Sequence, residues 1–353
     1  MRFDVPEAAG GGASTDGWGD GGIGALAFDA TGRRLAVGLA DRIAVYDPRS
    51  GARREEYPSA LVPALRVQCR DDGIATMARS VAFTRDGRHL VAGFDLRLTQ
   101  NDWARWIEVF VRDAGVHAYT LFAPDLARYP DTTSGTGRFA LSPDGTRLAT
   151  SLAERGTTIW DVARGVELRT FADVDAEVQV WSHDGTRLAV VRGGPRPLGV
   201  IDTAAGDVRW LALPTRGSGP PACLAFTPDG GRLVVVTAGK SAATSMVDLA
   251  TGVQRARPLP RGEALSAVHF GGVPPRVTWR RLPPWGGDAP LGLLRQGLTS
   301  SLPRVLRLRW TPPATTARPP WPEGWPLAMS LDGKHVARAL GATVVVTRVR
   351  TRR

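Results

Sequence analysis

Short apolar runs separated by polar turns recur along the chain. Each unit has an apolar residue, a polar turn that ends in glycine, and a second apolar run. Six copies are clear: FDATGRRLAVG at Phe28, FTRDGRHLVAG at Phe83, LSPDGTRLATS at Leu141, WSHDGTRLAVV at Trp181, FTPDGGRLVVV at Phe226 and MSLDGKHVARA at Met329. The turn glycines are 55, 58, 40, 45 and 103 residues apart, and a degenerate copy, VHFGGVPPRVTW from Val268, lies within the longest interval. The sequence therefore predicts seven repeat units.

Each unit has the pattern of four antiparallel strands. Asp-Gly between two apolar runs is the strongest short-range signal for a hairpin, because glycine adopts the positive φ that a tight turn needs. The apolar run that follows, such as Leu233 to Val236, is rich in β-branched residues that suit a buried strand. A third strand ends in an apolar-Asp pair before a Gly turn, as in VYDPRSG, IWDVARG, VIDTAAG and MVDLATG. A fourth, outer strand then follows, for example Val166 to Phe171.

In its SPDG-type hairpins and its Trp160-Asp161 dipeptide the chain resembles the WD40-like repeat family, in a bacterial-type form with degenerate repeats. Tyr46, Ile201 and Val247 stand where the family has tryptophan, and the units do not begin with Gly-His. The resemblance implies an all-β fold, a seven-bladed β-propeller of four-stranded antiparallel blades.

The last unit supplies a test of this fold, because only three strands precede the end of the chain: Leu327 to Ser330, Val336 to Leu340 and Thr343 to Arg348. We expect the N-terminal strand to pair as the fourth strand of this last blade, which would close the ring and remove the free edges there. One domain, 1–353, then consists of a closing strand at 1–6, a Gly-rich linker at 7–21 and the blades at 22–353.

Composition excludes several other classes of protein. The chain has 43% hydrophobic and 22% charged residues, values that are ordinary for a globular protein and exclude a largely disordered one. Its two cysteines, Cys69 and Cys223, lack the spacing of a disulfide framework or a thiolate zinc site. Because we find neither a signal peptide nor an apolar stretch long enough to span a membrane, we expect a soluble cytoplasmic protein.

The net charge of +11 is unevenly distributed. Residues 254–353 hold 17 basic and four acidic residues, a balance of +13, which leaves −2 for residues 1–253. The uneven distribution of charge bears on which partners the protein binds, and it says nothing about the fold.

Three segments depart from the repeat, at about 58–78, 95–107 and 273–326, and we expect function to reside there. The segments at 95–107 and 273–326 carry tryptophan and arginine, two residue types that are enriched at interface hot spots, and arginine also pairs well with carboxylate or phosphate groups. The candidate partner-binding residues are Trp103, Trp106, Arg276, Trp279, Arg280, Arg281, Trp285, Arg307, Arg309, Arg318, Trp321 and Trp325.

Signals for catalysis are poor. The five histidines lie in different units without metal-ligand spacing, and we assign His89 and His335, which fill the same slot two residues after the turn glycine, to the repeat itself. The turn aspartates Asp86, Asp144, Asp184, Asp229 and Asp332 are explained by hydrogen bonds to the local backbone rather than by a metal. We predict no catalytic residues, no metal and no cofactor, although a site assembled from separate loops stays open.

The sequence favours a non-enzymatic protein–protein interaction scaffold, a subunit of a bacterial multi-protein complex that docks one or more proteins through its loops and an Arg/Trp-rich face of the last two blades. The alternative is a nucleic-acid-binding propeller that uses the basic C-terminal sector. A weaker alternative is a small-ligand sensor or an enzyme with a pocket at the mouth of the central channel. The preference for a scaffold depends largely on analogy between folds.

Overall fold

A computed structural model describes the chain in segments. These are residues 1–8, 22–68, 75–97, 103–122, 135–152, 155–176, 178–191, 198–211, 221–227, 229–237, 243–258, 263–269, 276–281, 327–330, 335–340 and 342–348.

The described residues form a series of antiparallel sheets, most of which have four strands. Sheet 1 holds β2 (Ala25–Phe28), β3 (Leu35–Gly38), β4 (Arg42–Tyr46) and β5 (Arg53–Pro58). Sheet 2 holds β6 (Ala75–Phe83), β7 (His89–Arg97), β8 (Trp103–Val111) and β9 (Val116–Leu121). Sheet 3 holds β10 (Gly135–Leu141), β11 (Arg147–Leu152), β12 (Gly156–Asp161) and β13 (Glu167–Phe171).

Sheet 4 holds β14 (Val178–Trp181), β15 (Arg187–Val191), β16 (Leu198–Asp202) and β17 (Val208–Leu211). Sheet 5 holds β18 (Pro221–Phe226), β19 (Arg232–Thr237), β20 (Ala243–Asp248) and β21 (Gln254–Pro258). β22 (Glu263–His269) pairs with β23 (Arg276–Arg281). The terminal sheet holds β24 (Leu327–Met329), β25 (His335–Leu340), β26 (Thr343–Arg348) and β1 (Arg2–Asp4).

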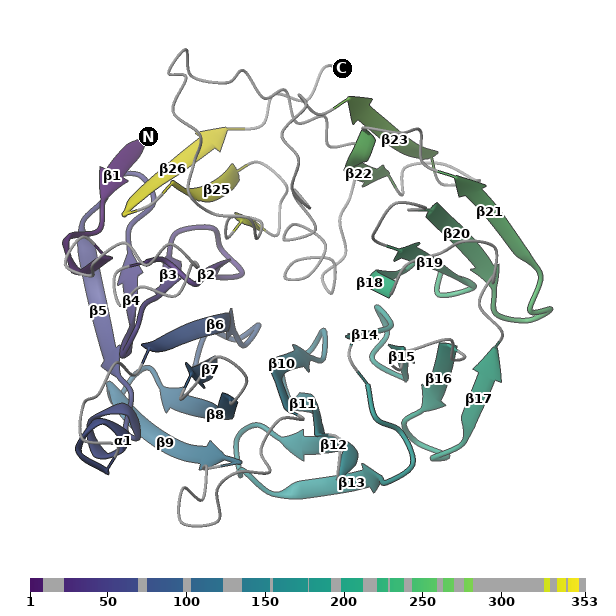
Figure 1. The fold of residues 1–353 in the computed structure, drawn as a ribbon, viewed down its shortest axis with the longest axis horizontal. Helices are drawn as coiled ribbons and strands as arrows, with labels where there is room; N and C mark the ends of the chain where they lie inside the picture. Colours follow the sequence, from purple (N-terminus) through teal and green to yellow (C-terminus); the bar gives the residue numbers. More distant parts are fainter. Residues whose placement is uncertain are drawn as a thin grey trace.

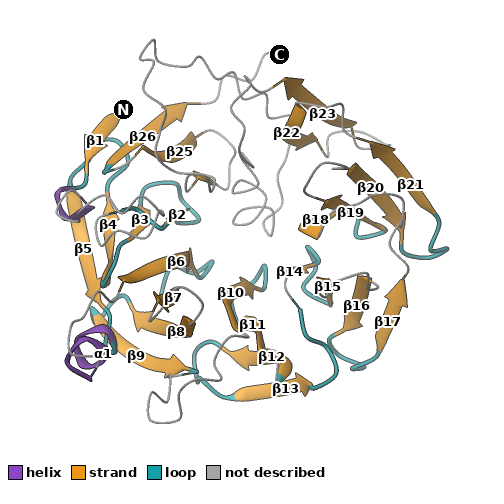
Figure 2. Cartoon of the chain, viewed as in Figure 1, coloured by secondary structure: helices purple, strands orange, loops and turns teal. Residues whose placement is uncertain are grey.

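The sheets follow one another around a central axis, and in each four-stranded sheet one edge strand lies inside and the other lies outside (Figure 1). Figure 2 shows that strands dominate and that the described helices, η1 (Pro6–Ala8) and α1 (Val62–Gln68), lie at the periphery. The tight turns that join the strands are formed as the Asp-Gly pattern predicts. The turn glycines have positive φ, for example 71° at Gly87 and 77° at Gly145, which residues with a Cβ adopt at a cost.

The hydrophobic core is divided among the junctions between neighbouring sheets. One cluster joins sheets 1 and 2 through Tyr57, Phe94 and Phe110, and another joins sheets 3 and 4 through Ile159 and Trp181. Trp160 and Trp181 are both buried, as their places within the repeat predict. Each sheet therefore depends on its neighbours to cover its faces, which is how repeat architectures gain stability.

The N-terminal strand lies in the terminal sheet beside the strands from the other end of the chain. β1 pairs antiparallel with β26, with Arg2 opposite Val345, and the Met1 ammonium group donates to the carbonyl of Val346 at 2.9 Å. The hydroxyl of Thr343 donates to Asp4 at 2.7 Å. These contacts hold β1 against β26 at the edge of the terminal sheet.

Two of the three segments that depart from the repeat contain regular structure. The segment at 58–78 includes α1 and the start of β6, and the segment at 95–107 consists largely of the ends of β7 and β8, which pair with Asp95 opposite Arg105. The segment at 95–107 thus lengthens the second hairpin of sheet 2, since β7 and β8 are longer than the corresponding strands of the other sheets. Of the segment at 273–326, the structure describes only β23.

Candidate interaction surfaces

The residues predicted to bind a partner divide into three groups. Trp103 and Trp106 lie on β8, at its first residue and within it. The backbone of β23 carries Arg276, Trp279, Arg280 and Arg281. Trp285, Arg307, Arg309, Arg318, Trp321 and Trp325 lie outside the described residues.

The structure corrects the prediction for Trp106, whose side chain has no exposed surface. Its ring stacks on Phe94 with a centroid separation of 5.4 Å and an interplanar angle of 11°, and its Nε1 donates to Glu108 Oε1 at 2.8 Å. Because β7 and β8 are long, Trp106 lies within the sheet 1–sheet 2 core rather than at a loop tip. Trp106 therefore belongs to the core and is not available to a partner.

Glu108 is a buried carboxylate that sequence reasoning missed. It accepts hydrogen bonds from the Ser59 hydroxyl at 2.6 Å, the Ala60 amide at 3.1 Å and the Trp106 indole, with no exposed surface of its own. Glu108 thus fixes the connection that leads into α1, whose residues Val62 and Leu65 pack into the same core. A single acidic residue within the apolar run WIEVFV was the available signal, because a buried charge needs several donors.

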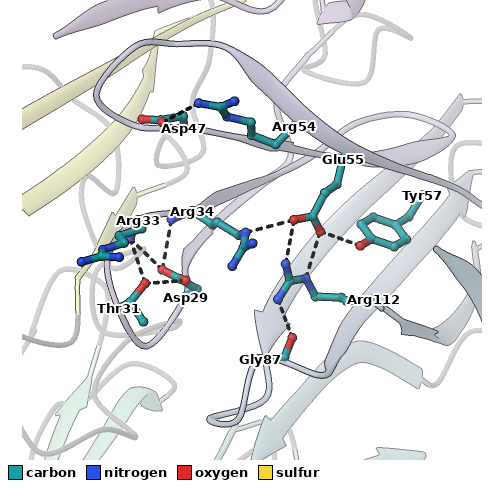
Figure 3. Close-up of polar contacts among 10 residues, drawn as sticks. All are labelled: Asp29, Thr31, Arg33, Arg34, Asp47, Arg54, Glu55, Tyr57, Gly87 and Arg112. Carbon is teal, nitrogen blue, oxygen red and sulfur yellow. Dashed lines mark hydrogen bonds and ion pairs between the residues drawn. The ribbon is translucent and has the colours of Figure 1, made fainter. Parts of the chain in front are cut away.

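The junction between sheets 1 and 2 also contains an ion-pair network (Figure 3). Arg112 donates to both carboxylate oxygens of Glu55, from Nη2 at 2.7 Å and from Nε at 3.0 Å, and also to the carbonyl of Gly87. Arg34 and the Tyr57 hydroxyl contact the same carboxylate at 3.0 and 2.6 Å. Two sheets are therefore joined through one acidic group.

The protonation states of this network follow from the contacts. Partial burial would raise the pKa of Glu55, but hydrogen bonds from Arg112 and Tyr57 outweigh it and hold that pKa below its ordinary value. Burial, together with the hydrogen bond to Glu55, raises the pKa of Tyr57. The Arg112 guanidinium also lies 5.2 Å from the centre of the Phe83 ring. Since its charge is compensated and its side chain almost covered, Arg112 serves to join sheets rather than to bind an external anion.

Arginines in the slot after the turn glycine make a related contact with the next sheet. The Arg147 guanidinium lies 4.8 Å from the centre of the Trp181 ring and donates to the carbonyl of Gly185 at 2.8 Å. Arg187 lies 5.8 Å from the centre of the Phe226 ring. Histidine fills the same slot at the first residues of β7 and β25, where the amide of His89 donates to Thr84 Oγ1 at 3.0 Å. This slot therefore has a structural role in the repeat.

The turn aspartates form the local hydrogen bonds that the sequence predicts. Asp184 Oδ1 accepts from the Ser182 hydroxyl at 2.6 Å and from the Thr186 amide at 3.0 Å, and these bonds lower its pKa to about 2. Asp86, Asp144 and Asp229 accept equivalent bonds, whereas Asp332 lies outside the described residues. Among the described residues, no group of three or more histidine, cysteine or acidic side chains is placed to hold a metal ion.

In sheet 3 the indole of Trp160 forms a hydrogen bond to the neighbouring strand. Trp160 Nε1 donates to the Thr150 hydroxyl at 2.9 Å, and this hydroxyl contacts the carbonyl of Thr158. The indole of Trp160 is thereby fixed against the neighbouring strand.

Within the described residues, no helix is both long enough and apolar enough to span a lipid bilayer.

Comparisons with known proteins identify the fold but no family. No family model matches the sequence, and no curated protein matches it. A chain in the crystal structure of the mitotic checkpoint complex is similar, with a TM-score of 0.59, 14% identity and coverage of 99% of this chain and 95% of that one. The Myceliophteria thermophila Cps50 (Swd1) β-propeller domain is similar at a TM-score of 0.59 and 13% identity, with coverage of 97% and 100%. The chain therefore has a β-propeller fold.

Proposed function

We propose that the chain is one seven-bladed propeller domain spanning residues 1–353, whose ring is closed by the N-terminal strand in the last blade. The strand order of the terminal sheet supports this proposal, because β1 takes the outer place that the repeat leaves vacant there. Residues 273–326 then belong to the sixth blade and its insertion.

Removal of residues 1–5 tests the closed ring. We expect the truncated chain to unfold at a lower temperature and to associate, because β26 then becomes a free edge. Circular dichroism and light scattering measure the two effects. A truncated chain with unchanged melting and mass would contradict the closed ring.

We propose that this propeller is a non-enzymatic scaffold that binds one or more proteins in a cytoplasmic multi-protein complex of a bacterium. One observation carries the proposal: the chain shares its β-propeller fold with a chain of the mitotic checkpoint complex. The Trp- and Arg-rich segment at 273–326 exceeds what a blade requires. We assign docking to that segment, which includes β23, because tryptophan and arginine are both enriched at interface hot spots.

A second candidate, nucleic-acid binding, is favoured by the balance of +13 in residues 254–353. Fluorescence anisotropy distinguishes the two proposed functions. It measures the binding of a 30-nucleotide single strand and of a duplex over a series of salt concentrations. Joint substitution of Arg280, Arg281, Arg307 and Arg309 by alanine serves as the site variant.

If the chain is a protein scaffold, we expect it to bind no nucleic acid at low salt. We also expect cross-linking in the source cell, followed by mass spectrometry, to identify a protein that is cross-linked to residues 273–326. Affinity for nucleic acid that falls steeply with the logarithm of salt concentration, and that the quadruple variant lacks, would replace the scaffold with the second candidate.

A further inference from the structure

The N-terminal strand β1 is held between two sheets. On one side it pairs with β26 of the terminal sheet in antiparallel register, next to which Figure 1 shows it. On the other side, its Phe3 side chain contacts Tyr46 of β4 and Gly51 of the turn between β4 and β5. We call the edge of β26 together with Tyr46, Gly51 and Ala342 the β1 site.

Phe3 is the aromatic anchor in the β1 site. The centre of its ring lies 5.2 Å from that of the Tyr46 ring, at an interplanar angle of 32°. A Cβ at Gly51 would lie 2.6 Å from the Cβ of Phe3, so a glycine at this position leaves the room that Phe3 occupies. Gly51 also has a φ of 73°, which a residue with a Cβ adopts at a cost. The turn of sheet 1 is therefore shaped to receive an aromatic side chain.

Val5 is a second, apolar anchor two residues further along the chain. Its side chain has no exposed surface and belongs to the cluster that contains Tyr46 of sheet 1 and Val344 of the terminal sheet. The amide of Val5 donates to the carbonyl of Ala342 at 2.8 Å, which continues the backbone pairing beyond β1. Because Phe3 and Val5 are two residues apart in an extended segment, both side chains face the core.

The residues that alternate with these anchors face outward. Arg2 and Asp4 are exposed, and Asp4 accepts a hydrogen bond from the Thr343 hydroxyl at 2.7 Å. The β1 site thus recognises an extended segment by backbone pairing, two apolar anchors and one acceptor between them. Sheet edges bind peptides in the same way, since main-chain hydrogen bonds provide affinity and alternate side chains provide specificity.

Two features favour the exchange of β1 for another strand. The paired register of β1 covers Thr343 to Val345, whereas β26 continues to Arg348, so a longer strand can form more backbone hydrogen bonds along this edge. Release of β1 also frees one end of the glycine-rich sequence GGGASTDGWGDGG, and glycine gains more backbone entropy on release than any other residue. Both features offset the contacts that are lost when β1 leaves.

We propose that the β1 site binds an extended segment of a partner protein, which displaces β1 and adds as a strand to the edge of β26. The segment carries an aromatic residue, an acidic residue and a β-branched apolar residue in succession, as β1 and Val5 do. A second copy of the chain is the less favourable occupant, because it must release its own β1 and because the net charge of +11 opposes association. The inference rests on the proposed closure of the ring by β1, and it concerns residues other than 273–326.

The test measures competition between β1 and a synthetic peptide, MRFDVPEA, with fluorescein at its carboxyl end. Fluorescence anisotropy follows the binding of the peptide to the full chain. Phe3→Ala in the chain should raise the affinity for the peptide at least tenfold, and Asp4→Ala about fivefold, because each weakens the internal competitor and leaves the β1 site intact. Arg2→Ala, at an exposed position of the same strand, is the matched control and should leave the affinity unchanged.

Two further measurements support this design. The peptide with alanine in place of its phenylalanine should bind at least tenfold more weakly to every chain, because the aromatic anchor is then missing. Circular dichroism verifies the folding of each variant. Asp4→Ala keeps the test valid if Phe3→Ala unfolds, because the Asp4 side chain is exposed and does not belong to the core.

Several outcomes would overturn the proposal. Absence of peptide binding to all of the chains would do so, as would equal affinity for a peptide with the same residues in scrambled order. Equal affinity of the native chain, Phe3→Ala and Asp4→Ala would place the peptide away from the β1 site. Dimers that form as the concentration rises, and that Phe3→Ala abolishes, would assign the site to β1 of a second copy.

The closed ring and this inference can fail separately. If removal of residues 1–5 lowers the melting temperature but no chain binds the peptide, the closed ring stands and the inference fails. If that removal leaves the melting temperature unchanged, the closed ring itself is contradicted, whatever the peptide does.

Discussion

Removal of the Glu108 carboxylate should loosen the connection between sheets 1 and 2. In Glu108→Gln the amide group that replaces Oε2 faces the Ala60 N–H, which donates at 3.1 Å in the native protein. One buried donor is then unpaired, at about 1–3 kcal/mol, and the bonds from Ser59 and Trp106 lose their ionic acceptor. Loss of the buried charge offsets part of this cost, so we expect a net loss of about 2–3 kcal/mol. Glu108→Ala should cost roughly 3–5 kcal/mol, because a cavity and the donors of Ser59, Ala60, Leu61 and Trp106 remain.

The assay combines urea unfolding, followed by tryptophan fluorescence, with hydrogen exchange of the peptide that covers residues 59–68. Glu56→Gln is the matched control, because Glu56 pairs with Arg42 and Arg53 near the surface, where ion pairs contribute less than about 1 kcal/mol. We expect Glu108→Gln alone to increase exchange in α1, since local opening follows the loss of its anchor. Equal losses of stability in the two variants, with unchanged exchange in α1, would refute the reasoning.

Further predictions concern the inter-sheet arginine, pH and the turns. Arg112→Ala should lower the free energy of unfolding by about 2–4 kcal/mol in urea titrations because the partly buried Glu55 carboxylate loses its two-point ion pair and keeps only Arg34 and Tyr57. Arg54→Ala should change it by less than about 1 kcal/mol. Asp184 has a folded pKa of about 2, below its ordinary value of 3.8, so its contribution to stability is present above about pH 4 and is lost as the pH falls toward 2. Asp184→Asn should flatten that dependence in thermal melts, and an unchanged slope would count against it. Gly145→Ala should be more destabilising than Gly115→Ala, although both glycines have positive φ. A Cβ at Gly145 would lie 2.7 Å from the Arg85 amide nitrogen, whereas a Cβ at Gly115 would meet no atom within 4 Å. Equal melting temperatures of the two variants would contradict this prediction.

The repeat was readable from the sequence because its signals are local. Asp-Gly turns and β-branched runs determine the hairpins, and they predicted the strands of sheets 3, 4 and 5. The tertiary role of Trp106 was not readable in this way. Its place within an apparent insertion suggested a loop, but the paired register of β7 and β8 continues through it. Whether a tryptophan is buried or exposed depends on the length of the strands around it, and a short stretch of sequence does not contain those strands.

The candidate sites differ for the same reason. Glu108 contacts Ser59 and Ala60, which lie 49 and 48 residues earlier in the chain, and such distant partners cannot be inferred from composition or spacing. The slot two residues after the turn glycine was assigned to the repeat from His89 and His335. The contact that Arg147 makes from the same slot with Trp181 of the next sheet could be seen only from the arrangement of the sheets.

The pairing of β1 with β26 also bears on how the chain is made. Arg2–Asp4 leaves the ribosome well before its hydrogen-bonding partner at Thr343–Arg348, since Asp4 and Thr343 are 339 residues apart, so β1 must wait unpaired while the strands between them are made. Because the Met1 nitrogen itself donates to the carbonyl of Val346, residues fused directly before Met1 would enter this late-formed contact.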